Sequence, residues 1–259
     1  ELLRNPDMGA TLRRIAADGI EDFYAGETAA RIVADMEANG GLISQADLAT
    51  CAPEENEPLW GEYRGYWFST NHPPGGGIML IEMLNILENF DLAAMGHNSP
   101  EYIRVVAEAM KIATVDKDTK VGDPRFYDVP VAELTSKEYA ARKAEQIMRD
   151  EKCAVPRVNQ GGGESKHTTQ VTVTDEHGNC VTMTHTLGQP SGVVTDGLGF
   201  MYNGAMTVFD PRPGHAGSLA PGKARFTAVS PTIVFKDAAP YLVLGAPGAT
   251  YITMGNLQV

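Results

Sequence analysis

A threonine that follows a glycine-rich stretch is the residue best suited to chemistry in this sequence. Thr168 begins a run in which apolar and polar residues alternate, and GGGESKH precedes it. A threonine hydroxyl needs a base to remove its proton, and one known base is the threonine's own α-amino group, freed when the preceding peptide bond is cut. That amine has a reference pKa of about 7.7–8.0, so it accepts a proton near neutral pH. The pattern permits self-cleavage between His167 and Thr168, although threonine is also common in ordinary strands.

The residues that follow predict a partner hydroxyl for Thr168. A hairpin loop made of a type I turn and one left-handed residue favours glycine in its third position, which the sequence EHG at 176–178 supplies. This turn pairs Asp175 with Asn179. Counting outward, Thr168 faces Thr186, and directly opposed residues have Cβ atoms about 4.5–5.5 Å apart. The same register pairs Val173 with Val181 and Val171 with Met183.

Two halves of the chain with different periodicity position these residues. Residues 1–150 carry apolar side chains at helical spacing, and helix starts are predicted at Asn5, Ser99 and Ser136. The stretch 151–167 has almost no apolar periodicity and holds three consecutive glycines, which is typical of a linker. Beyond it the period changes to two, and PTIVF and PYLVLGAPG flank a further turn, which indicates antiparallel sheet.

The composition argues against several other classes of function. Net charge is −12, from 33 acidic and 21 basic residues, and no basic cluster stands out, so nucleic acid and anionic membranes are poor partners. No apolar run approaches the roughly 18 residues of a membrane span. Cys51, Cys153 and Cys180 form no CxxC pair, and the histidines show no ligand spacing. We therefore expect no metal and no organic cofactor.

Several long stretches, in the same order along the chain, match one known family. They read TLRRIAADGIEDFYAGETAARIVADMEANGGLISQADLA, EYRGYWFSTNHPPGGGIMLIEMLNILENFDL, AEAMKIATVDKD, VGDPRF, TTQVTVTDEHGNCVTMTHTL, SPTIVFKD and GAPGAT. On these stretches the chain resembles the γ-glutamyltranspeptidases, which are N-terminal-nucleophile hydrolases. The resemblance implies an α+β fold, the four-layer αββα sandwich, of which this chain holds a part. It implies that 1–167 is the C-terminal part of a large-subunit-like region and that 168–259 begins a small-subunit-like region.

The resemblance also assigns roles to particular residues. The family's small subunit begins at the first threonine of a TT pair, which is Thr168 here, so processing would separate His167 from Thr168. Its second catalytic threonine lies in a TxTL pattern and falls on Thr186, which the register had already placed opposite Thr168. Its oxyanion hole is two successive backbone N–H groups, here those of Gly248 and Ala249. A plain glycine turn at the end of a strand is the alternative for this last pair.

The chain departs from the family where the family reads a γ-glutamyl head with polar side chains. Gly188, Ala205 and Val208 stand at positions where the family has asparagine, glutamine and aspartate, so an ammonium group would lose its carboxylate partner. Thr227 replaces one of the family's paired serines. Thr227 and Arg225 could still hold a substrate carboxylate, while Arg225 as a surface cation is the alternative. We therefore expect a divergent member of the family.

The function implied by the resemblance is that of a self-cleaving zymogen, an amidohydrolase or acyltransferase that works through an acyl-threonine ester. It would take a small-molecule amide or a γ-glutamyl-type substrate, as in glutathione metabolism, and its large and small fragments would associate after cleavage. One alternative is an acylase or amidohydrolase acting on a non-γ-glutamyl amide, and another is an unprocessed, non-enzymatic relative that serves binding or assembly. The resemblance implies a periplasmic or secreted protein, but the sequence shows no signal peptide, so a cytoplasmic location stays open. We expect an internal segment of a longer protein.

Overall fold

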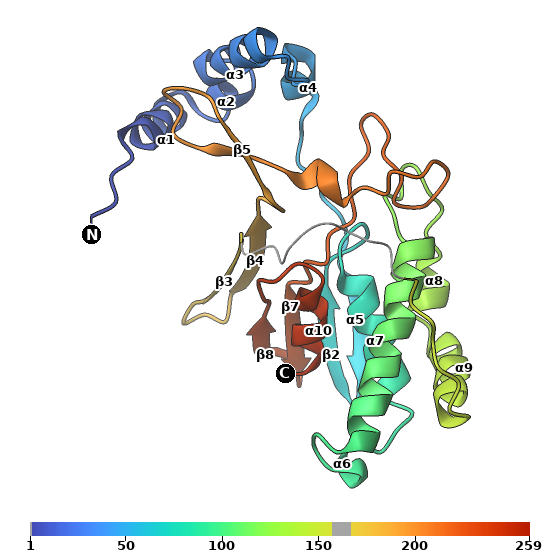
Figure 1. Cartoon of the computed structure of the whole chain (residues 1–259). Helices are drawn as coiled ribbons and strands as arrows, with labels where there is room; N and C mark the ends of the chain where they lie inside the picture. Colours follow the sequence, from blue (N-terminus) through green and yellow to red (C-terminus); the bar gives the residue numbers. More distant parts are fainter. Residues whose placement is uncertain (1, 157–166) are drawn as a thin grey trace. The chain divides into compact units, whose positions relative to one another are not determined.

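The computed structural model describes residues 2–156 and 167–259, which divide into two units (Figure 1). The smaller unit comprises Glu1–Glu55 and Pro190–Gly204, and the larger comprises Asn56–Gln189 and Ala205–Val259. The resemblance predicts another kind of division, into the regions 1–167 and 168–259 on the two sides of the expected cleavage point. That division stays a prediction. Each unit is described by itself.

The smaller unit combines short helices with one two-stranded sheet. Asn5 accepts a hydrogen bond from the backbone N–H of Met8 and Pro6 occupies the first turn, so the predicted start of the first helix is confirmed. The Thr11 hydroxyl donates to the carbonyl oxygen of Leu198 at 2.9 Å, and Leu198 is fully buried among apolar helix residues. The elements are α1 (Pro6–Asp18), α2 (Glu21–Tyr24), α3 (Glu27–Asn39), α4 (Gln45–Thr50), β5 (Pro190–Val194) and β6 (Met201–Asn203).

The larger unit is built on an antiparallel sheet with the strand order β1-β2-β7-β8. Its strands are β1 (Leu59–Tyr63), β2 (Tyr66–Thr70), β7 (Thr232–Lys236) and β8 (Ala239–Leu244), and its helices are α5 (Gly77–Leu87), α6 (Leu92–Met95), α7 (Pro100–Lys120), α8 (Val131–Leu134), α9 (Lys137–Met148), α10 (Tyr251–Leu257) and the 3₁₀ helix η1 (Ala205–Val208). The predicted caps Ser99 and Ser136 begin α7 and α9, each accepting a hydrogen bond from a backbone N–H.

Helix α5 forms the centre of this unit. It contacts β1 on one side and α7, α9 and α10 on others (Figure 1). Leu80 and Ile81 pack with Phe68 of the sheet, while Ile78 and Met83 pack with residues of α7 and α9. Because nearly every residue of α5 is buried, the helix joins the sheet to the outer helices through apolar contact.

The hairpin of β1 and β2 was not identified from the sequence, which suggested mainly helices up to residue 150. Its turn consists of Arg64 and Gly65, both with positive φ (51° and 84°). A turn of this kind usually carries Asn-Gly or Asp-Gly, and Arg-Gly gives a much weaker signal. The hairpin matters for the architecture because β2 also pairs with β7 from the far end of the chain.

A second hairpin is formed by β3 (Thr168–Thr174) and β4 (Cys180–Thr186), and its predicted register is confirmed. Thr168 pairs with Thr186, Val171 with Met183 and Val173 with Val181. Gly178 has φ of 82°, so it is the left-handed residue of the turn, and the N–H of Asp175 donates to Asn179. The Thr182 hydroxyl donates to the carbonyl oxygen of Leu244 at 3.1 Å and thereby ties β4 to the end of β8.

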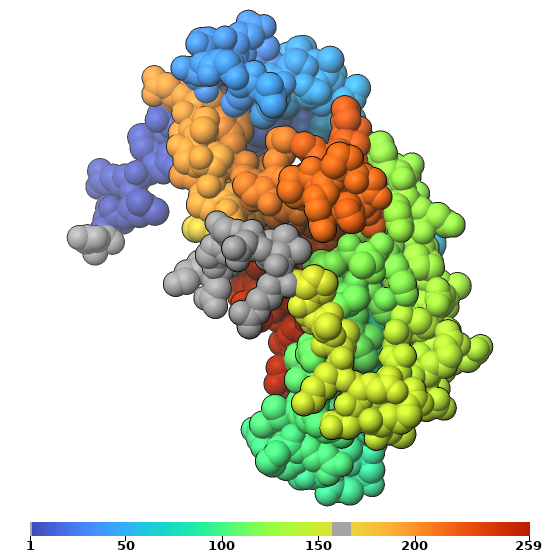
Figure 2. Space-filling view, turned by 45° about the vertical axis from the view of Figure 1, so that its right-hand side comes forward, coloured from blue at the N-terminus to red at the C-terminus, as the bar shows by residue number. Residues whose placement is uncertain are grey.

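The segment between η1 and β7 lies against the loop that follows α7 (Figure 2). The carboxylate of Asp123 accepts from the N–H of Ala224 at 2.7 Å, and the carbonyl oxygen of Gly222 accepts from Arg125 at 3.2 Å. A Cβ atom on Gly122 would meet the carbonyl oxygen of Ala216 at 2.3 Å, so only glycine permits this approach. These contacts hold the residues just before Arg225 in place.

Candidate active site

The two threonine hydroxyls predicted to face each other are in hydrogen-bond contact. The Oγ1 of Thr168 donates to the Oγ1 of Thr186 at 2.9 Å. Both side chains are half-buried at the open end of the β3–β4 hairpin. The pairing of strands brings them together because directly opposed side chains lie on the same face of a sheet. A hydroxyl at this distance can orient Thr168 or exchange a proton with it.

The Thr186 hydroxyl has further partners around the peptide bond that precedes Thr168. It donates to the carbonyl oxygen of His167 at 3.4 Å and accepts from the backbone N–H of Gly188 at 2.9 Å. His167 itself is exposed. The Thr186 hydroxyl therefore lies between the Thr168 hydroxyl and the carbonyl group that a cut at this position would have to activate.

Gln170 is a residue of this hairpin that sequence reasoning missed. Its Nε2 donates to the Oγ1 of Thr182 at 2.8 Å, and its Oε1 accepts from Thr184. Gln170 also fills the space beside Gly245, where a Cβ atom would lie 2.3 Å from its Oε1. It shares a strand face with Thr168, two residues away, and this alternation was the signal that could have identified it. Its bonds fix the face on which the two catalytic candidates lie.

Gly248 and Ala249 lie in the turn between β8 and α10. Their φ angles are 133° and 52°, and the N–H of Tyr251 donates back to the carbonyl oxygen of Gly248 at 3.0 Å. Ala249 adopts a left-handed conformation, which costs a non-glycine residue about 1 kcal/mol. Within the part of the chain that the structure describes, neither N–H group of this pair has a hydrogen-bond acceptor. Both therefore remain able to bind an oxyanion.

Thr227 lies in a segment held between the loop before α5 and helix α10. Its N–H donates to the carbonyl oxygen of Pro74 at 2.9 Å, and the Thr253 hydroxyl of α10 donates to the carbonyl oxygen of Ala228 at 2.9 Å. The Thr227 hydroxyl accepts a long bond of 3.4 Å from the N–H of Val229. Because the Thr227 hydroxyl is the acceptor in this bond, its own hydrogen stays able to donate to another group, such as a substrate.

The structure brings Gly188, Ala205 and Arg225 together. Gly188 is buried with φ of 67°, and a Cβ atom on it would lie 3.5 Å from Nη2 of Arg225 and 3.6 Å from Cβ of Ala205. Arg225 is half-buried, not a fully exposed cation, and its Nη1 donates to the carbonyl oxygen of Phe226 at 2.9 Å. Val208 ends η1 with 42% of its side chain exposed. Two of the residues predicted to bind substrate, Gly188 and Arg225, therefore lie next to each other.

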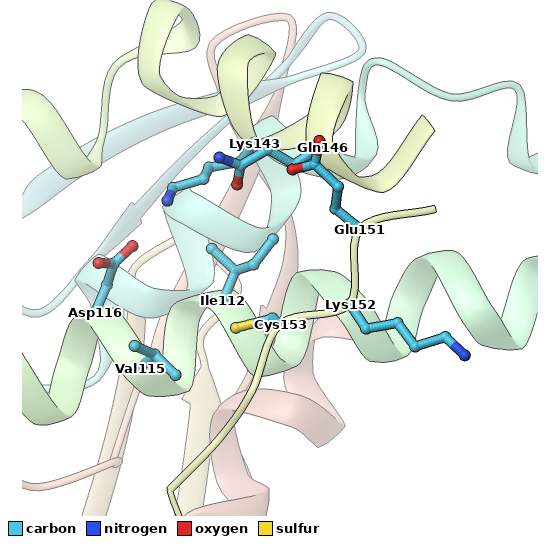
Figure 3. Close-up of a pocket in the computed structure, with 8 residues that line it drawn as sticks. All are labelled: Ile112, Val115, Asp116, Lys143, Gln146, Glu151, Lys152 and Cys153. Atoms are coloured by element: carbon cyan, nitrogen blue, oxygen red, sulfur yellow. The ribbon is translucent and has the colours of Figure 1, made fainter. Parts of the chain in front are cut away.

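A pocket elsewhere in the larger unit lacks the features of an active site. It has a volume of about 170 Å³ and lies between α7, α9 and residues 151–153 (Figure 3). Cys153 lines it, but burial raises the pKa of this thiol and so disfavours the reactive thiolate. No residue predicted to act in catalysis or binding lines the pocket. We therefore place the candidate site at the threonine pair.

In residues 2–156 and 167–259, no group of three or more His, Cys, Asp or Glu side chains is arranged to hold a metal ion. In the same ranges, no helix is both long enough and apolar enough to cross a membrane.

Comparisons with known proteins find relatives that are named as proenzymes. The sequence model described as Gamma-glutamyltranspeptidase matches residues 1–259. The chain is 43% identical to the Acylase ACY 1 proenzyme of Pseudomonas sp. (strain V22), covering 97% of this chain and 46% of that protein. It is 36% identical to the Glutathione hydrolase proenzyme of Escherichia coli (strain K12), covering 100% of this chain and 47% of that protein. The chain thus spans about half the length of these relatives.

A solved structure agrees with these relatives. The crystal structure of cephalosporin acylase from Bacillus halodurans superposes with a TM-score of 0.85 at 29% identity, over 100% of this chain and 47% of that chain. This likeness confirms the expected fold class, the α+β sandwich of the N-terminal-nucleophile hydrolases, of which this chain makes up a part.

Proposed function

Because the chain belongs to the gamma-glutamyltranspeptidase family, we propose that it is part of a self-cleaving amide hydrolase or acyltransferase whose nucleophile is Thr168. The observation that carries this proposal is the 2.9 Å hydrogen bond between the hydroxyls of Thr168 and Thr186. It is supported by the position of Thr168 as the first residue of β3, directly after the bond to be cut.

Self-cleavage would use the same hydroxyl that later attacks the substrate. The Thr168 Oγ1 attacks the carbonyl carbon of His167, its proton passes to the amide nitrogen, and the peptide C–N bond breaks. The acyl group has then moved from nitrogen to oxygen, and the nitrogen has become the free α-amine of Thr168. Water then hydrolyses the resulting ester, which releases the carboxyl group of His167 and restores the Thr168 hydroxyl. The Thr186 hydroxyl, which donates to the carbonyl oxygen of His167, would stabilise the charge that develops on that oxygen.

Turnover would then run through an acyl-threonine ester. The free α-amine of Thr168 accepts the proton of its own hydroxyl as Oγ1 bonds to the amide carbonyl carbon of the substrate. The backbone N–H groups of Gly248 and Ala249 would bind the tetrahedral oxyanion. The proton passes to the leaving amine as the amide C–N bond breaks. Water, or a second amine in acyl transfer, then takes the acyl group from Thr168.

The two fragments would stay associated after such a cut. Strand β2 belongs to the part before Thr168, and β7 belongs to the part after it. Nevertheless the two strands pair in an antiparallel register from Trp67 opposite Phe235 to Thr70 opposite Thr232. The sheet of the larger unit would therefore contain strands of both fragments, and their backbone hydrogen bonds would hold the fragments together.

The proposal is tested by sequencing the N-terminus of the smaller fragment of the full-length protein. We expect Thr-Thr-Gln-Val, and any other start would refute the assignment of Thr168. Thr168→Ala should abolish both cleavage and turnover, whereas Thr169→Ala, which removes the neighbouring exposed hydroxyl, should leave cleavage in place. A single uncut band from the wild-type protein would favour a non-enzymatic binding or assembly protein.

A second candidate is an acylase that acts on an amide without a γ-glutamyl head. The side chains of Ala205 and Val208 cannot pair an α-ammonium group, and Gly188 offers no side chain at all. The relative from Pseudomonas sp. (strain V22), with 43% identity, is itself named an acylase. Comparing γ-glutamyl and glutaryl anilides with the same leaving group tests this candidate. We expect a higher kcat/KM for the glutaryl compound, and a strong preference for γ-glutamyl would count against it.

A further inference from the structure

Two separate sheets of the larger unit carry the proposed nucleophile and the proposed oxyanion donors. Thr168 begins β3 of the two-stranded β3–β4 sheet, whereas Gly248 and Ala249 follow β8 of the four-stranded sheet. Among the described residues, no strand of one sheet pairs with a strand of the other. A two-stranded sheet is only marginally stable by itself. Because β4 nevertheless contacts β8, side chains must hold the hairpin against that strand (Figure 1).

A chain of three hydrogen bonds, all running in one direction, makes this connection. The Thr184 hydroxyl donates to Oε1 of Gln170, and Nε2 of Gln170 donates to Oγ1 of Thr182 at 2.8 Å. The Thr182 hydroxyl donates in turn to the carbonyl oxygen of Leu244 at 3.1 Å. Since a carbonyl oxygen can only accept, Thr182 has to accept from Gln170, which fixes the orientation of the amide. Hydrogen bonds in such a chain polarise and so strengthen one another.

The backbone of Gly245 lies directly against the Gln170 amide. A Cβ atom on Gly245 would lie 2.3 Å from Oε1, 2.4 Å from Cδ and 2.7 Å from Nε2 of Gln170. Gly245 is not among the glycines with positive φ, so glycine is needed here for the close approach alone. Gln170 therefore contacts the end of β8 directly as well as through Thr182. This contact lies three residues before Gly248.

On the basis of the proposed function, we propose that Gln170 is a positioning residue, which holds the strand that begins with Thr168 in a fixed place relative to the oxyanion donors of Gly248 and Ala249. Such donors stabilise a transition state only when they lie about 2.7–3.1 Å from the developing charge. A displacement of about 1 Å can lower the rate by about 100-fold. Gln170 is two residues from Thr168 on the same strand face, so loss of its contact with Gly245 would change this geometry.

Self-cleavage should depend much less on Gln170 than turnover does. In the proposed cleavage, the charge on the carbonyl oxygen of His167 is stabilised by Thr186, which lies on the hairpin itself. The β3–β4 ladder sets the position of Thr186 relative to Thr168 without the end of β8. A variant that loosens the hairpin from β8 should therefore mature normally and turn over slowly. A residue needed only for the fold would affect both steps.

The test measures maturation and turnover in Gln170→Met, which keeps the length of the side chain but removes both of its hydrogen-bonding groups. We expect the full-length variant to self-cleave on denaturing gels at nearly the wild-type rate. We expect kcat per titrated active site to fall by about 10- to 100-fold with little change in KM. The substrate is whichever of γ-glutamyl and glutaryl p-nitroanilide the wild-type protein hydrolyses faster.

Two further variants separate the chain of bonds from a general effect on the hairpin. Thr182→Val should lower kcat to the same extent as Gln170→Met, and the double variant should be no slower than either single one, because both changes break one connection. Thr172→Val is the matched control. Thr172 is the exposed cross-strand partner of Thr182 on the same face, and its variant should keep the wild-type kcat.

An equal loss of maturation and turnover in Gln170→Met would overturn the proposal, because the residue would then serve the fold. Additive effects of Gln170→Met and Thr182→Val would overturn it too, since the two residues would act separately. Amide hydrogen exchange gives a readout that needs no turnover. In Gln170→Met, exchange should become faster in residues 168–186 and 244–249 and stay unchanged in α5. If the wild-type protein shows no turnover, the proposed function fails, and faster exchange in both segments still supports Gln170 as the residue that holds the hairpin to β8. Unchanged exchange would refute this inference alone.

Discussion

The larger unit holds one polar cluster between its helices and another at the open end of a hairpin, and they differ in charge and in burial. The first, which we call the carboxylate cluster, comprises Glu82, Asp116, Lys120 and Tyr139 of α5, α7 and α9. The Tyr139 hydroxyl donates to the carboxylate of Asp116 at 2.6 Å, and the Lys120 ammonium lies 2.8 Å from the other oxygen of that carboxylate. The second, the threonine cluster, comprises His167, Thr168, Thr186 and Gly188, which are joined by neutral hydrogen bonds.

Protonation differs between the members of the carboxylate cluster. Burial, and after it the hydrogen bond with and the charge of the neighbouring Asp116, raises the pKa of Glu82 well above its ordinary value and so favours its protonated form. Burial also favours the neutral form of Asp116, but the bonds from Glu82, Lys120 and Tyr139 outweigh it and lower its pKa. Asp116 is thus the common partner of three side chains, and removing it takes away the acceptor of the Tyr139 hydroxyl and the charged partner of Lys120. The hydrogen bonds of the threonine cluster join only hydroxyl and backbone groups, so rearranging them is far less costly.

The comparison teaches that the same unit uses polar groups for two purposes. The two carboxyl groups of the carboxylate cluster are buried, with Glu82 and Asp116 only 1% and 5% exposed, which fits a role in holding three helices together. The hydroxyls of the threonine cluster are half-buried and can change partners, which fits chemistry. Substitutions in the first should therefore affect stability, and substitutions in the second should affect rate.

The largest effect is expected at the carboxylate cluster. Asp116→Ala should lower the free energy of unfolding by about 2–4 kcal/mol, because it removes the acceptor of the buried Tyr139 hydroxyl and of Glu82 and the charged partner of the half-buried Lys120. Urea unfolding monitored by circular dichroism measures this loss. Asp118→Ala, on the same helix with 44% of its side chain exposed, is the matched control and should change stability by less than about 1 kcal/mol. If both variants lose the same stability, the distinction between the clusters is wrong.

A smaller effect, on rate and not on stability, is expected at the threonine cluster. Thr186→Ala should lower kcat by about 10- to 100-fold, because the hydroxyl that orients Thr168 is removed while the nucleophile stays in place. Mass spectrometry should still find a slow acyl adduct on Thr168, and an adduct on Thr186 of the wild-type protein would reverse the two roles. Thr172→Ala, on the same face of the hairpin but in β3, should leave kcat nearly unchanged. A large drop in the unfolding midpoint of Thr186→Ala would show that this cluster is structural.

The smallest effect is expected at Asp123, a buried carboxylate outside both clusters. Burial favours the neutral form of Asp123, but the Arg125 side chain and the N–H groups of Ala224 and Arg125 outweigh it and lower its pKa to about 2. A lowered pKa means that the stabilisation is present above the ordinary pKa of about 4 and is lost as the pH falls towards 2. Asp123→Asn should therefore cost about 1 kcal/mol at pH 7, and the difference from the wild type should shrink between pH 4 and pH 2.5. A difference that grows with acid would contradict this assignment.

The features that were predictable from the sequence rest on local rules. The β3–β4 register followed from one glycine in the turn and from alternation along each strand, and it placed Thr168 opposite Thr186. The contact between Gly188 and Arg225 could not be derived in this way, because the two residues are distant in sequence and meet only through tertiary packing. The same holds for Glu82, an acidic residue in an apolar helix whose partners lie on two other helices. The β1–β2 hairpin was missed because its Arg-Gly turn gives a weak local signal.

The pairing of β2 with β7 would set an order of events for the proposed maturation. In the uncut chain these strands belong to one molecule, so the search for the correct pairing is confined by the connecting chain and its effective concentration is high. Once the bond before Thr168 is cut, the same pairing joins separate polypeptides, and refolding becomes a bimolecular reaction that slows on dilution. Folding must then precede cleavage. Thus a mature protein denatured and diluted should recover far less structure than the uncut Thr168→Ala chain treated in the same way.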